Sequence, residues 1–247
     1  MRAPALPRHG LARVLSKRGL CSRTQAAAWI REGRVSVNGR TVCDPEFPVR
    51  MELDRIDVAG LDDATAPPVY LALNKPRGLV TTARDEHGRD TVYRCFDGAG
   101  LPWIAPVGRL DRASEGLLLF SNDPAWAASI TDAGRGPDKT YHVQVDRVPD
   151  ADLLAALEAG CEIDGDRLAA VRARLLRHGA RNAWLEIVLD EGRNRHIRRL
   201  LQAHGVGVLR LLRVSIGPLA LGALGRGAWR LLEPGEVAAL ARPRDRR

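Results

Sequence analysis

The sequence lacks the cysteine spacing of a zinc site or a disulfide framework. Its four cysteines, Cys21, Cys43, Cys95 and Cys161, are widely separated, and no C-x-x-C pair occurs. Zinc modules and disulfide-rich secreted domains both depend on closely and regularly spaced cysteines. We therefore expect reduced thiols in a cytosolic protein.

Long hydrophobic runs are also missing. No stretch of eighteen apolar residues occurs, which argues against a transmembrane helix. Residues 1–8 lack the apolar segment of a secretory signal. No basic helix with bulky apolar residues favours attachment to a membrane surface. Together these features predict a cytoplasmic protein without a membrane partner.

Motifs for metal and nucleotide binding are absent as well. The sequence contains neither the H-E-x-x-H motif of zinc metalloproteases nor the G-x-S-x-G motif of serine hydrolases. The phosphate-binding loop G-x-x-x-x-G-K-[ST] does not occur either. We expect neither a metal nor a nucleotide cofactor. Five histidines have no metal-ligand spacing: His9, His87, His142, His178 and His204.

The chain has the composition of a globular protein and an excess of positive charge. It has 247 residues, of which 45% are hydrophobic, enough for one large or two small domains with their own cores. Lysine and arginine outnumber aspartate and glutamate by 38 to 30, which gives a formal net charge of +8. Such an excess favours a polyanionic partner, most commonly a nucleic acid.

The N-terminal quarter predicts two short helices followed by a β-hairpin. The first helix has an apolar stripe that begins at Leu11, and Gly19 ends it. Ser22 and Gln25 form a capping box at the start of the second helix. The Asn-Gly pair at 38–39 is a strong short-range signal for a hairpin.

This region is strongly basic. Eight basic residues and one acid, Glu32, lie between residues 8 and 42. The strings L-x-x-V-L-x-x-x-G-x-x-S-R and G-R-V-x-V-N-G resemble the αL motif, a small RNA-binding module shared with a ribosomal small-subunit protein. The resemblance covers residues 9–59 and implies phosphate contacts that supply affinity; the alternative is a solvated basic face. The candidate contacts are Arg13, Lys17, Arg18, Arg23 and Arg34.

A change in composition separates this module from the rest of the chain. Residues 60–68 are rich in small residues, acids and proline, which predicts a linker. A second domain would then cover residues 69–242. Apolar patterns and capping residues predict strands at 69–73, 139–145 and 185–189 and helices at 124–132 and 151–159.

A carboxylate in a short loop is the strongest candidate for chemistry. Asp111 lies between Arg109 and Arg112, and the apolar run that ends at Phe120 predicts a buried strand directly after the loop. Nearby positive charge favours the ionised form of an acid. An aspartate in such a loop is more often a turn former or an ion-pair partner, so the residue types alone leave both interpretations open.

Two other segments carry candidate site residues. Tyr141 falls on the apolar face of strand 139–145, where periodicity alone favours a core aromatic. In the helix predicted before Gly205, Arg198 borders the apolar stripe and can aim into a cleft, whereas Arg199 is expected to face water. The six arginines between residues 192 and 213, with no acid among them, suit either a phosphate backbone or a solvated basic face.

The string from Gly108 to Asp123 resembles the signature G-R-L-D-x-x-[TS]-x-G-L-L-L-x-[TS]-N-D of the bacterial ribosomal pseudouridine synthases of the RsuA type. N-K-P-x-G at 74–78, K-T-Y at 139–141 and G-x-N-R-x-I-R-R at 192–199 follow the motifs of the same family in order. The resemblance implies an α+β fold, in which a mixed, mostly antiparallel central sheet follows the αL domain.

The resemblance also implies roles for single residues. Asp111 would be the catalytic residue, Tyr141 would stack on the target base, and Arg198 would be the partner that orients Asp111. His196 stands where the family usually has glutamine, so its role is not implied. Further candidate RNA contacts in this domain are Arg109, Lys75 and Arg195.

The expected activity is the isomerisation of uridines in ribosomal RNA to pseudouridine, without a cofactor. The target base must leave its stack, and Asp111 would act at the ribose as a nucleophile or a base. The strings N-K-P-R-G-x-V-x-T and G-R-D-T-V are more similar to members that act on the large subunit. We expect a monomer.

Three alternatives compete with this hypothesis. A non-catalytic RNA-binding protein or a structural factor in ribosome assembly would explain the basic module but not the motifs around Asp111. A glycosidase would need a second carboxylate across the scissile bond, and Glu115 is the only candidate nearby.

Overall fold

The structure is a computed structural model that describes residues 7–61 and 67–243. It divides into two compact units. Unit 1 contains the chain up to Val69 together with the short segments 99–105 and 121–124, and unit 2 contains the remainder. Most of the predicted linker, residues 62–66, lies outside the described residues.

Unit 1 confirms the two helices and the hairpin. The Ser22 hydroxyl accepts a hydrogen bond of 3.0 Å from the Gln25 backbone N–H, which caps the second helix. Asn38 and Gly39 have φ values of 52° and 80°, the left-handed pair that a tight hairpin turn requires. The elements are β1 (His9–Gly10), α1 (Leu11–Lys17), α2 (Arg23–Arg31), β2 (Val35–Val37), β3 (Arg40–Thr41), β4 (Pro48–Val49) and β5 (Ile56–Val58).

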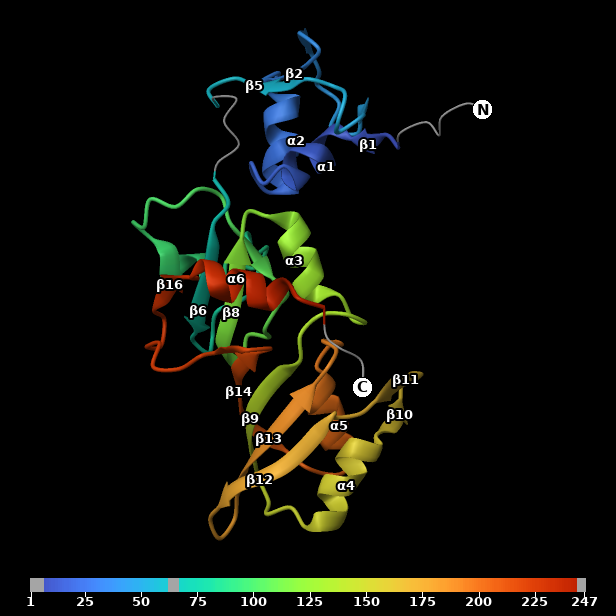
Figure 1. Cartoon of the computed structure of the whole chain (residues 1–247), viewed down its shortest axis with the longest axis vertical. Helices are drawn as coiled ribbons and strands as arrows, with labels where there is room; N and C mark the ends of the chain where they lie inside the picture. Colours follow the sequence, from blue (N-terminus) through green and yellow to red (C-terminus); the bar gives the residue numbers. More distant parts are fainter. Residues whose placement is uncertain (1–6, 62–66, 244–247) are drawn as a thin grey trace. The chain divides into compact units, whose positions relative to one another are not determined.

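Unit 2 is built on one large sheet, in the order β12-β13-β9-β14-β8-β6-β16 (Figure 1). Strands β8 and β14 pair in parallel, whereas β12–β13, β13–β9, β9–β14 and β6–β16 are antiparallel. The predicted α+β class with a mostly antiparallel sheet is therefore confirmed. The strands are β6 (Tyr70–Lys75), β7 (Ala105–Val107), β8 (Glu115–Ser121), β9 (Lys139–Val145), β10 (Cys161–Ile163), β11 (Asp166–Leu168), β12 (Arg172–His178), β13 (Ala183–Leu189), β14 (Val208–Ile216), β15 (Leu219–Ala220) and β16 (Trp229–Leu231).

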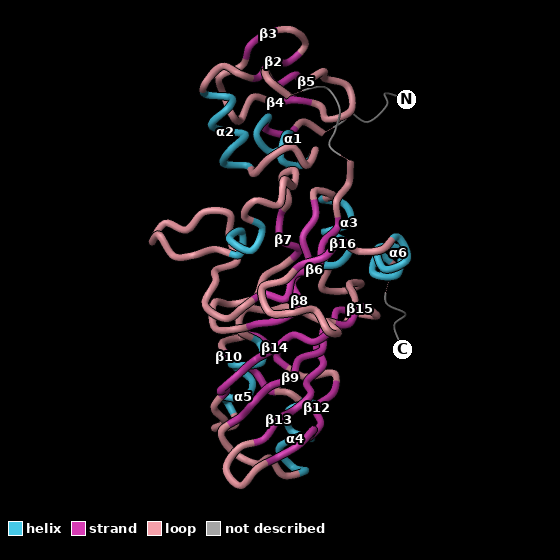
Figure 2. Tube along the Cα trace, turned by 90° about the vertical axis from the view of Figure 1, so that its left-hand side faces the viewer, coloured by secondary structure: helices cyan, strands magenta, loops and turns pink. Residues whose placement is uncertain are grey.

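Helices cover the sheet at both of its ends. At one end α4 and α5 lie beside β9, β12, β13 and β14 (Figure 2). At the other end α3 and α6 pack over β6 and β8, where Trp126, Ile130 and Leu240 join the buried core with Leu117 and Leu119. The helices are η1 (Val92–Phe96, a 3-10 helix), α3 (Pro124–Thr131), α4 (Ala151–Ala159), α5 (His196–Ala203) and α6 (Pro234–Ala241).

Strands β8 and β14 approach unusually closely at Gly116. This residue has φ of 102°, and a Cβ built on it would lie 2.3 Å from the Arg213 carbonyl oxygen. A residue with a side chain would clash with the backbone of β14, so only glycine fits here. Because Gly116 is directly opposite Arg213 in the parallel register, it sets how near the loop before β8 lies to β14.

Helix α6 and the nine-residue strand β14 are among the elements that the sequence analysis does not predict, although α6 has a Glu233–Glu236 capping box and begins with a proline. In β14 the arginines at 210 and 213 break the apolar pattern, so the segment is typical of a basic face. Its pairing with β9 on one side and β8 on the other makes it a central strand.

Candidate active site

The loop that carries Asp111 is held through its backbone. It joins β7 to β8, and every carbonyl from Leu110 to Ser114 accepts a hydrogen bond. The Thr81 hydroxyl donates to the Leu110 oxygen at 2.7 Å, and the Gly78 N–H donates to the Arg112 oxygen at 2.7 Å. The Asp111 side chain is therefore presented by a loop whose main chain is fixed on both sides.

Lys75 supplies the centre of this support. Its side chain is fully buried, and Nζ donates to the oxygens of Pro76, Asp111 and Ser114 at 3.0, 3.3 and 2.9 Å. Burial lowers the pKa of Lys75 from 10.5 to about 8, and the negative charges of Asp111 and Glu115 oppose that shift. The predicted phosphate contact of Lys75 is wrong, because its ammonium lies beneath the loop and not at the surface.

Tyr141 lies on the apolar face of β9, as predicted. Buried and half-buried residues alternate along this strand, and Tyr141 is 7% exposed. Its register partners are Ile187 on β13 and Arg213 on β14, so the ring lies in the middle of the sheet. This position fixes the ring direction through three paired strands.

Arg198 reaches the Asp111 loop from α5. Its Nη2 donates to the Ala113 oxygen at 3.3 Å, and Nη1 donates to the Val208 oxygen at 3.4 Å. Burial is the main cause that lowers the pKa of Arg198, Arg195 acts in the same direction, and the charge of Asp111 opposes both. Arg198 thus holds the loop by its backbone and places a positive charge close to Asp111.

These side chains share one cavity of about 440 Å³ within unit 2. Its volume is in the range of small-molecule sites. Asp111, Tyr141 and Arg198 line it, although they come from a loop, a strand and a helix that are far apart in the sequence. The exposed residues Arg109 and Arg195 line it too. Sequence reasoning missed other polar side chains of the lining: Ser114, Thr131, Lys139, Glu191, Arg193 and Arg213.

Known proteins resemble this chain over nearly all of its length. The sequence model described as RNA pseudouridylate synthase matches residues 69–203, which is more than half of the chain. The chain belongs to the RNA pseudouridylate synthase family. A second model, described as the S4 domain, matches residues 10–55. The family predicted from the motif at 108–123 is thereby confirmed.

Individual members of the family show how far the likeness extends. The ribosomal large subunit pseudouridine synthase B of Bacillus subtilis is 36% identical over 233 residues, which cover 93% of this chain and 94% of that protein. An uncharacterized RNA pseudouridine synthase of Aquifex aeolicus is 36% identical over 230 residues, 92% of each chain. A crystal structure of a pseudouridylate synthase superposes with a TM-score of 0.63 at 29% identity, covering 95% of this chain and 99% of that one.

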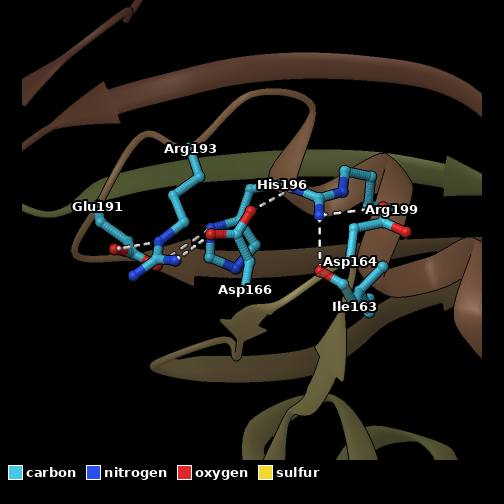
Figure 3. A network of polar contacts seen from close by, with 7 residues as sticks. All are labelled: Ile163, Asp164, Asp166, Glu191, Arg193, His196 and Arg199. Atoms are coloured by element: carbon cyan, nitrogen blue, oxygen red, sulfur yellow. Dashed lines mark hydrogen bonds and ion pairs between the residues drawn. The ribbon is translucent and has the colours of Figure 1, made fainter.

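In this member of the family, three of the six arginines of the acid-free run are paired with acids from elsewhere. Arg193 and Arg199 both bind Asp166 on the β10–β11 hairpin, at 2.7 and 3.0 Å (Figure 3). Arg210 pairs with Glu115 at 2.9 Å. Half of the run therefore forms internal ion pairs, whereas Arg195, Arg198 and Arg213 line the cavity and have no ion pair within the described residues.

The prediction that Arg199 faces water is wrong. Its side chain is 19% exposed, and Nη2 donates to the Ile163 oxygen at 2.8 Å (Figure 3). The β10–β11 hairpin packs against α5. Asp166 on this hairpin joins Arg199 of the helix to Arg193 of the loop before it, so the hairpin fixes the start of α5.

We expect Asp166→Asn to reduce turnover a few-fold without unfolding the protein. The amide cannot hold two guanidinium groups by charge, so the start of α5, and with it Arg198, becomes less well placed. Arg199 and Arg193 keep the pKa of Asp166 below its usual range, despite some desolvation. Its stabilising contribution is therefore complete above the ordinary aspartate pKa and is lost as the pH falls through the lowered value.

The measurement is kcat at pH 7, together with the urea midpoint at pH 7 and at pH values below the ordinary aspartate pKa of 3.8, where the difference in midpoint between wild type and Asp166→Asn should shrink. Glu162→Gln is the matched control, because it removes one negative charge from the same hairpin. Glu162 lies on the neighbouring strand of the hairpin and is exposed. Equal kcat values for the two variants would contradict a role of Asp166 in positioning α5.

His196, at the start of α5, is a buried group. It is 3% exposed, its Nδ1 lies 3.7 Å from Glu191 Oε1, and neither ring nitrogen forms a hydrogen bond of good geometry. Burial lowers the pKa of His196, with Glu191 opposing. The imidazole therefore packs between the loop and the helix, where burial disfavours its charged form.

In unit 1 the predicted RNA contacts differ in availability. Arg13 and Lys17 are exposed on α1. Arg18 is half-buried, and its Nη2 donates to the oxygens of Met51 and Asp54 at 3.0 and 3.4 Å, so it also holds the fold of the unit.

The other two cations of unit 1 are exposed but have partners. Arg23 lies 3.4 Å from Glu46, and both side chains are more than half exposed. Arg34 donates to the Ala59 oxygen at 3.2 Å and lies over the Trp29 ring at 5.4 Å. Exposed pairs of this kind are weak and can exchange for a phosphate.

In residues 7–61 and 67–243, no group of three or more metal-ligating side chains occurs. No helix in these ranges is long and apolar enough to cross a membrane. The four cysteines, all within these ranges, are free thiols.

Proposed function

We propose that this protein isomerises specific uridines of ribosomal RNA, and more specifically of the large subunit. The observation that carries the proposal is the convergence of Asp111, Tyr141 and Arg198 on one cavity. The large-subunit assignment is supported by the name of the Bacillus subtilis relative, which aligns with almost the whole chain. We also propose that the protein acts as a monomer and is located in the cytoplasm, where ribosomes are assembled.

The reaction exchanges one glycosidic bond for another. The C1′–N1 bond of uridine breaks, the uracil turns, and a C1′–C5 bond forms; C5 loses its proton and N1 gains one. Nothing leaves the nucleotide and no electrons are exchanged with another molecule, so the chemistry can be done with side chains alone. The uracil must first be everted into the cavity, which costs a few kcal/mol of stacking.

Each of the three residues has a part in this proposal. Asp111 acts at the ribose, either by attack on carbon or by removal of a proton; both need the ionised carboxylate. Tyr141 stacks on the everted uracil. Arg198 steadies the loop of Asp111 and offsets its charge. The exposed residues Arg109 and Arg195 bind phosphates at the mouth of the cavity.

The glycosidase alternative loses support from the position of Glu115. This side chain is 9% exposed, is held by Arg210 at 2.9 Å and is not part of the cavity lining. It cannot face Asp111 across a bound sugar as a paired acid would. The other acid of the lining, Glu191, is paired with Arg193 at 2.8 Å. A purely RNA-binding role remains the competing function, because the S4 domain and the positive charge would serve it equally well.

The decisive experiment is a map of pseudouridines in both ribosomal RNAs of a deletion strain. We expect at least one pseudouridine to be missing from the large-subunit RNA and to return when the wild-type gene is supplied. Purified protein should also release tritium from large-subunit transcripts that contain 5-tritiated uridine. An unchanged map together with no tritium release would favour the RNA-binding alternative. A pseudouridine missing from the small-subunit RNA instead would show that the protein acts on the small subunit.

A further inference from the structure

Arg213 is a buried arginine in the wall of the cavity. It lies on β14, is 5% exposed and is directly opposite Tyr141 in the antiparallel register. The two residues therefore share one face of the sheet, and both line the cavity with Asp111. In the sequence, Arg213 is distinguished only as a member of the basic run between residues 192 and 213.

The charge of this guanidinium is not compensated within the protein. Nε donates to the Leu117 oxygen at 2.7 Å, whereas Nη2 is buried and has no hydrogen-bond partner. In the part of the chain that the structure describes, no carboxylate lies within ion-pair distance of Arg213. A buried charge with one carbonyl partner is costly, and buried polar groups are normally satisfied. Because Nη2 is enclosed by protein atoms, a ligand in the cavity would supply its acceptor to Nη1, which is not enclosed and forms no hydrogen bond with the described residues.

The depth of Arg213 decides which part of the RNA it can meet. Phosphates stay on the strand when a nucleotide is everted, and the base enters deepest. The exposed residues Arg109 and Arg195 are suited to the phosphates, whereas Arg213 lies beside Tyr141 at the level of the sheet. Resting on the proposed function, we propose that Arg213 donates a hydrogen bond to a carbonyl oxygen of the everted uracil.

Because uracil is nearly symmetric, the same contact can form both before and after the base turns. N1 and C5 are related by the axis through N3 and C6, and so are the two carbonyl groups at C2 and C4. When the base turns about that axis to exchange N1 for C5, one carbonyl takes the place of the other. Arg213 therefore meets an oxygen before and after the turn. Cytosine carries an amino group at C4, which would place a donor against a donor in one of the two orientations.

The proposal can be tested with RNA in which sulfur replaces one carbonyl oxygen. Oligonucleotides carry uridine, 2-thiouridine or 4-thiouridine at the target position, once that position has been mapped. Single-turnover conversion and RNA affinity are measured for wild type, Arg213→Gln and Arg213→Lys. We expect at least one sulfur substitution to slow wild type roughly tenfold to a hundredfold, the effect of losing a hydrogen bond to a charged group.

The contact itself is identified by how the two changes combine. In Arg213→Gln the same sulfur substitution should add little, because the donor that it affects is already gone. Arg210→Gln is the matched control: this arginine is on the same strand, is paired with Glu115 and does not line the cavity. Arg210→Gln should keep the full sulfur effect of wild type.

Two results would overturn the inference. One is a sulfur effect of equal size in wild type and in both Arg213 variants, which would make Arg213 a purely structural residue. The other is full activity of wild type on both thio-RNAs, a result that needs no variant to fold. If wild type does not convert the unmodified RNA at all, the proposed function fails, and that outcome is distinct from both.

Discussion

Asp111→Asn is expected to abolish tritium release, with a fall of about 1000-fold or more in turnover. The amide has nearly the same size as the carboxylate but has no negative charge to attack carbon or accept a proton. The loop should keep its shape, because Lys75, Thr81 and Arg198 hold it through backbone oxygens. RNA affinity should therefore be unchanged in a filter-binding or fluorescence titration.

A control carboxylate makes this result specific. Asp97→Asn removes a charge from an exposed position of the same unit that does not line the cavity. It should release tritium at the wild-type rate. Turnover by Asp111→Asn within tenfold of wild type would show that another group does the chemistry. A parallel loss of RNA binding would instead mean that the substitution disturbs the loop.

Lys75→Met is expected to have the largest effect on stability. Methionine has a similar length but no donor, so the oxygens of Pro76, Asp111 and Ser114 lose their shared partner. A buried acceptor without a partner costs about 1–3 kcal/mol. Part of this cost is offset, because the buried ammonium is removed. We expect a net loss of about 2–4 kcal/mol, together with at least a tenfold loss of turnover as the Asp111 loop becomes mobile.

The control for this variant is Leu73→Met, which introduces the same side chain two residues earlier on the same face of β6. Leu73 is fully buried and forms no polar contact through its side chain. A leucine-to-methionine change usually costs less than about 1.5 kcal/mol. Urea unfolding and single-turnover assays of both variants separate the loss of the ammonium from the loss of packing. Equal effects would contradict the supporting role of Lys75.

The lowered pKa of Lys75 also predicts a pH dependence. The group is protonated below about 8 in the folded chain, and below its ordinary value of 10.5 in the unfolded chain. Between these values the unfolded chain binds more protons, so the contribution of Lys75 to stability rises with pH. The difference in unfolding free energy between wild type and Lys75→Met should therefore widen from pH 7 to pH 10. A constant difference would contradict this assignment.

Local signals in the sequence were sufficient for much of the fold. The cap at Ser22, the turn at 38–39 and the alternation in strand 139–145 each depend on residues within a few positions of one another. The motif around Asp111 was enough to identify the family, because its fixed positions are contiguous. These features do not require knowledge of what packs against them.

Only the tertiary structure decided which charged side chains serve the site. Lys75 is 39 residues from Ser114, and Arg198 is 85 residues from Ala113, yet each pair is joined by a hydrogen bond. Likewise, Arg199 is partly buried by the β10–β11 hairpin, whose Asp166 binds it. Arg213 is enclosed because β8 approaches β14 closely at Gly116. A side chain's charge can be read from the sequence, but its burial and partners depend on segments that only folding brings together.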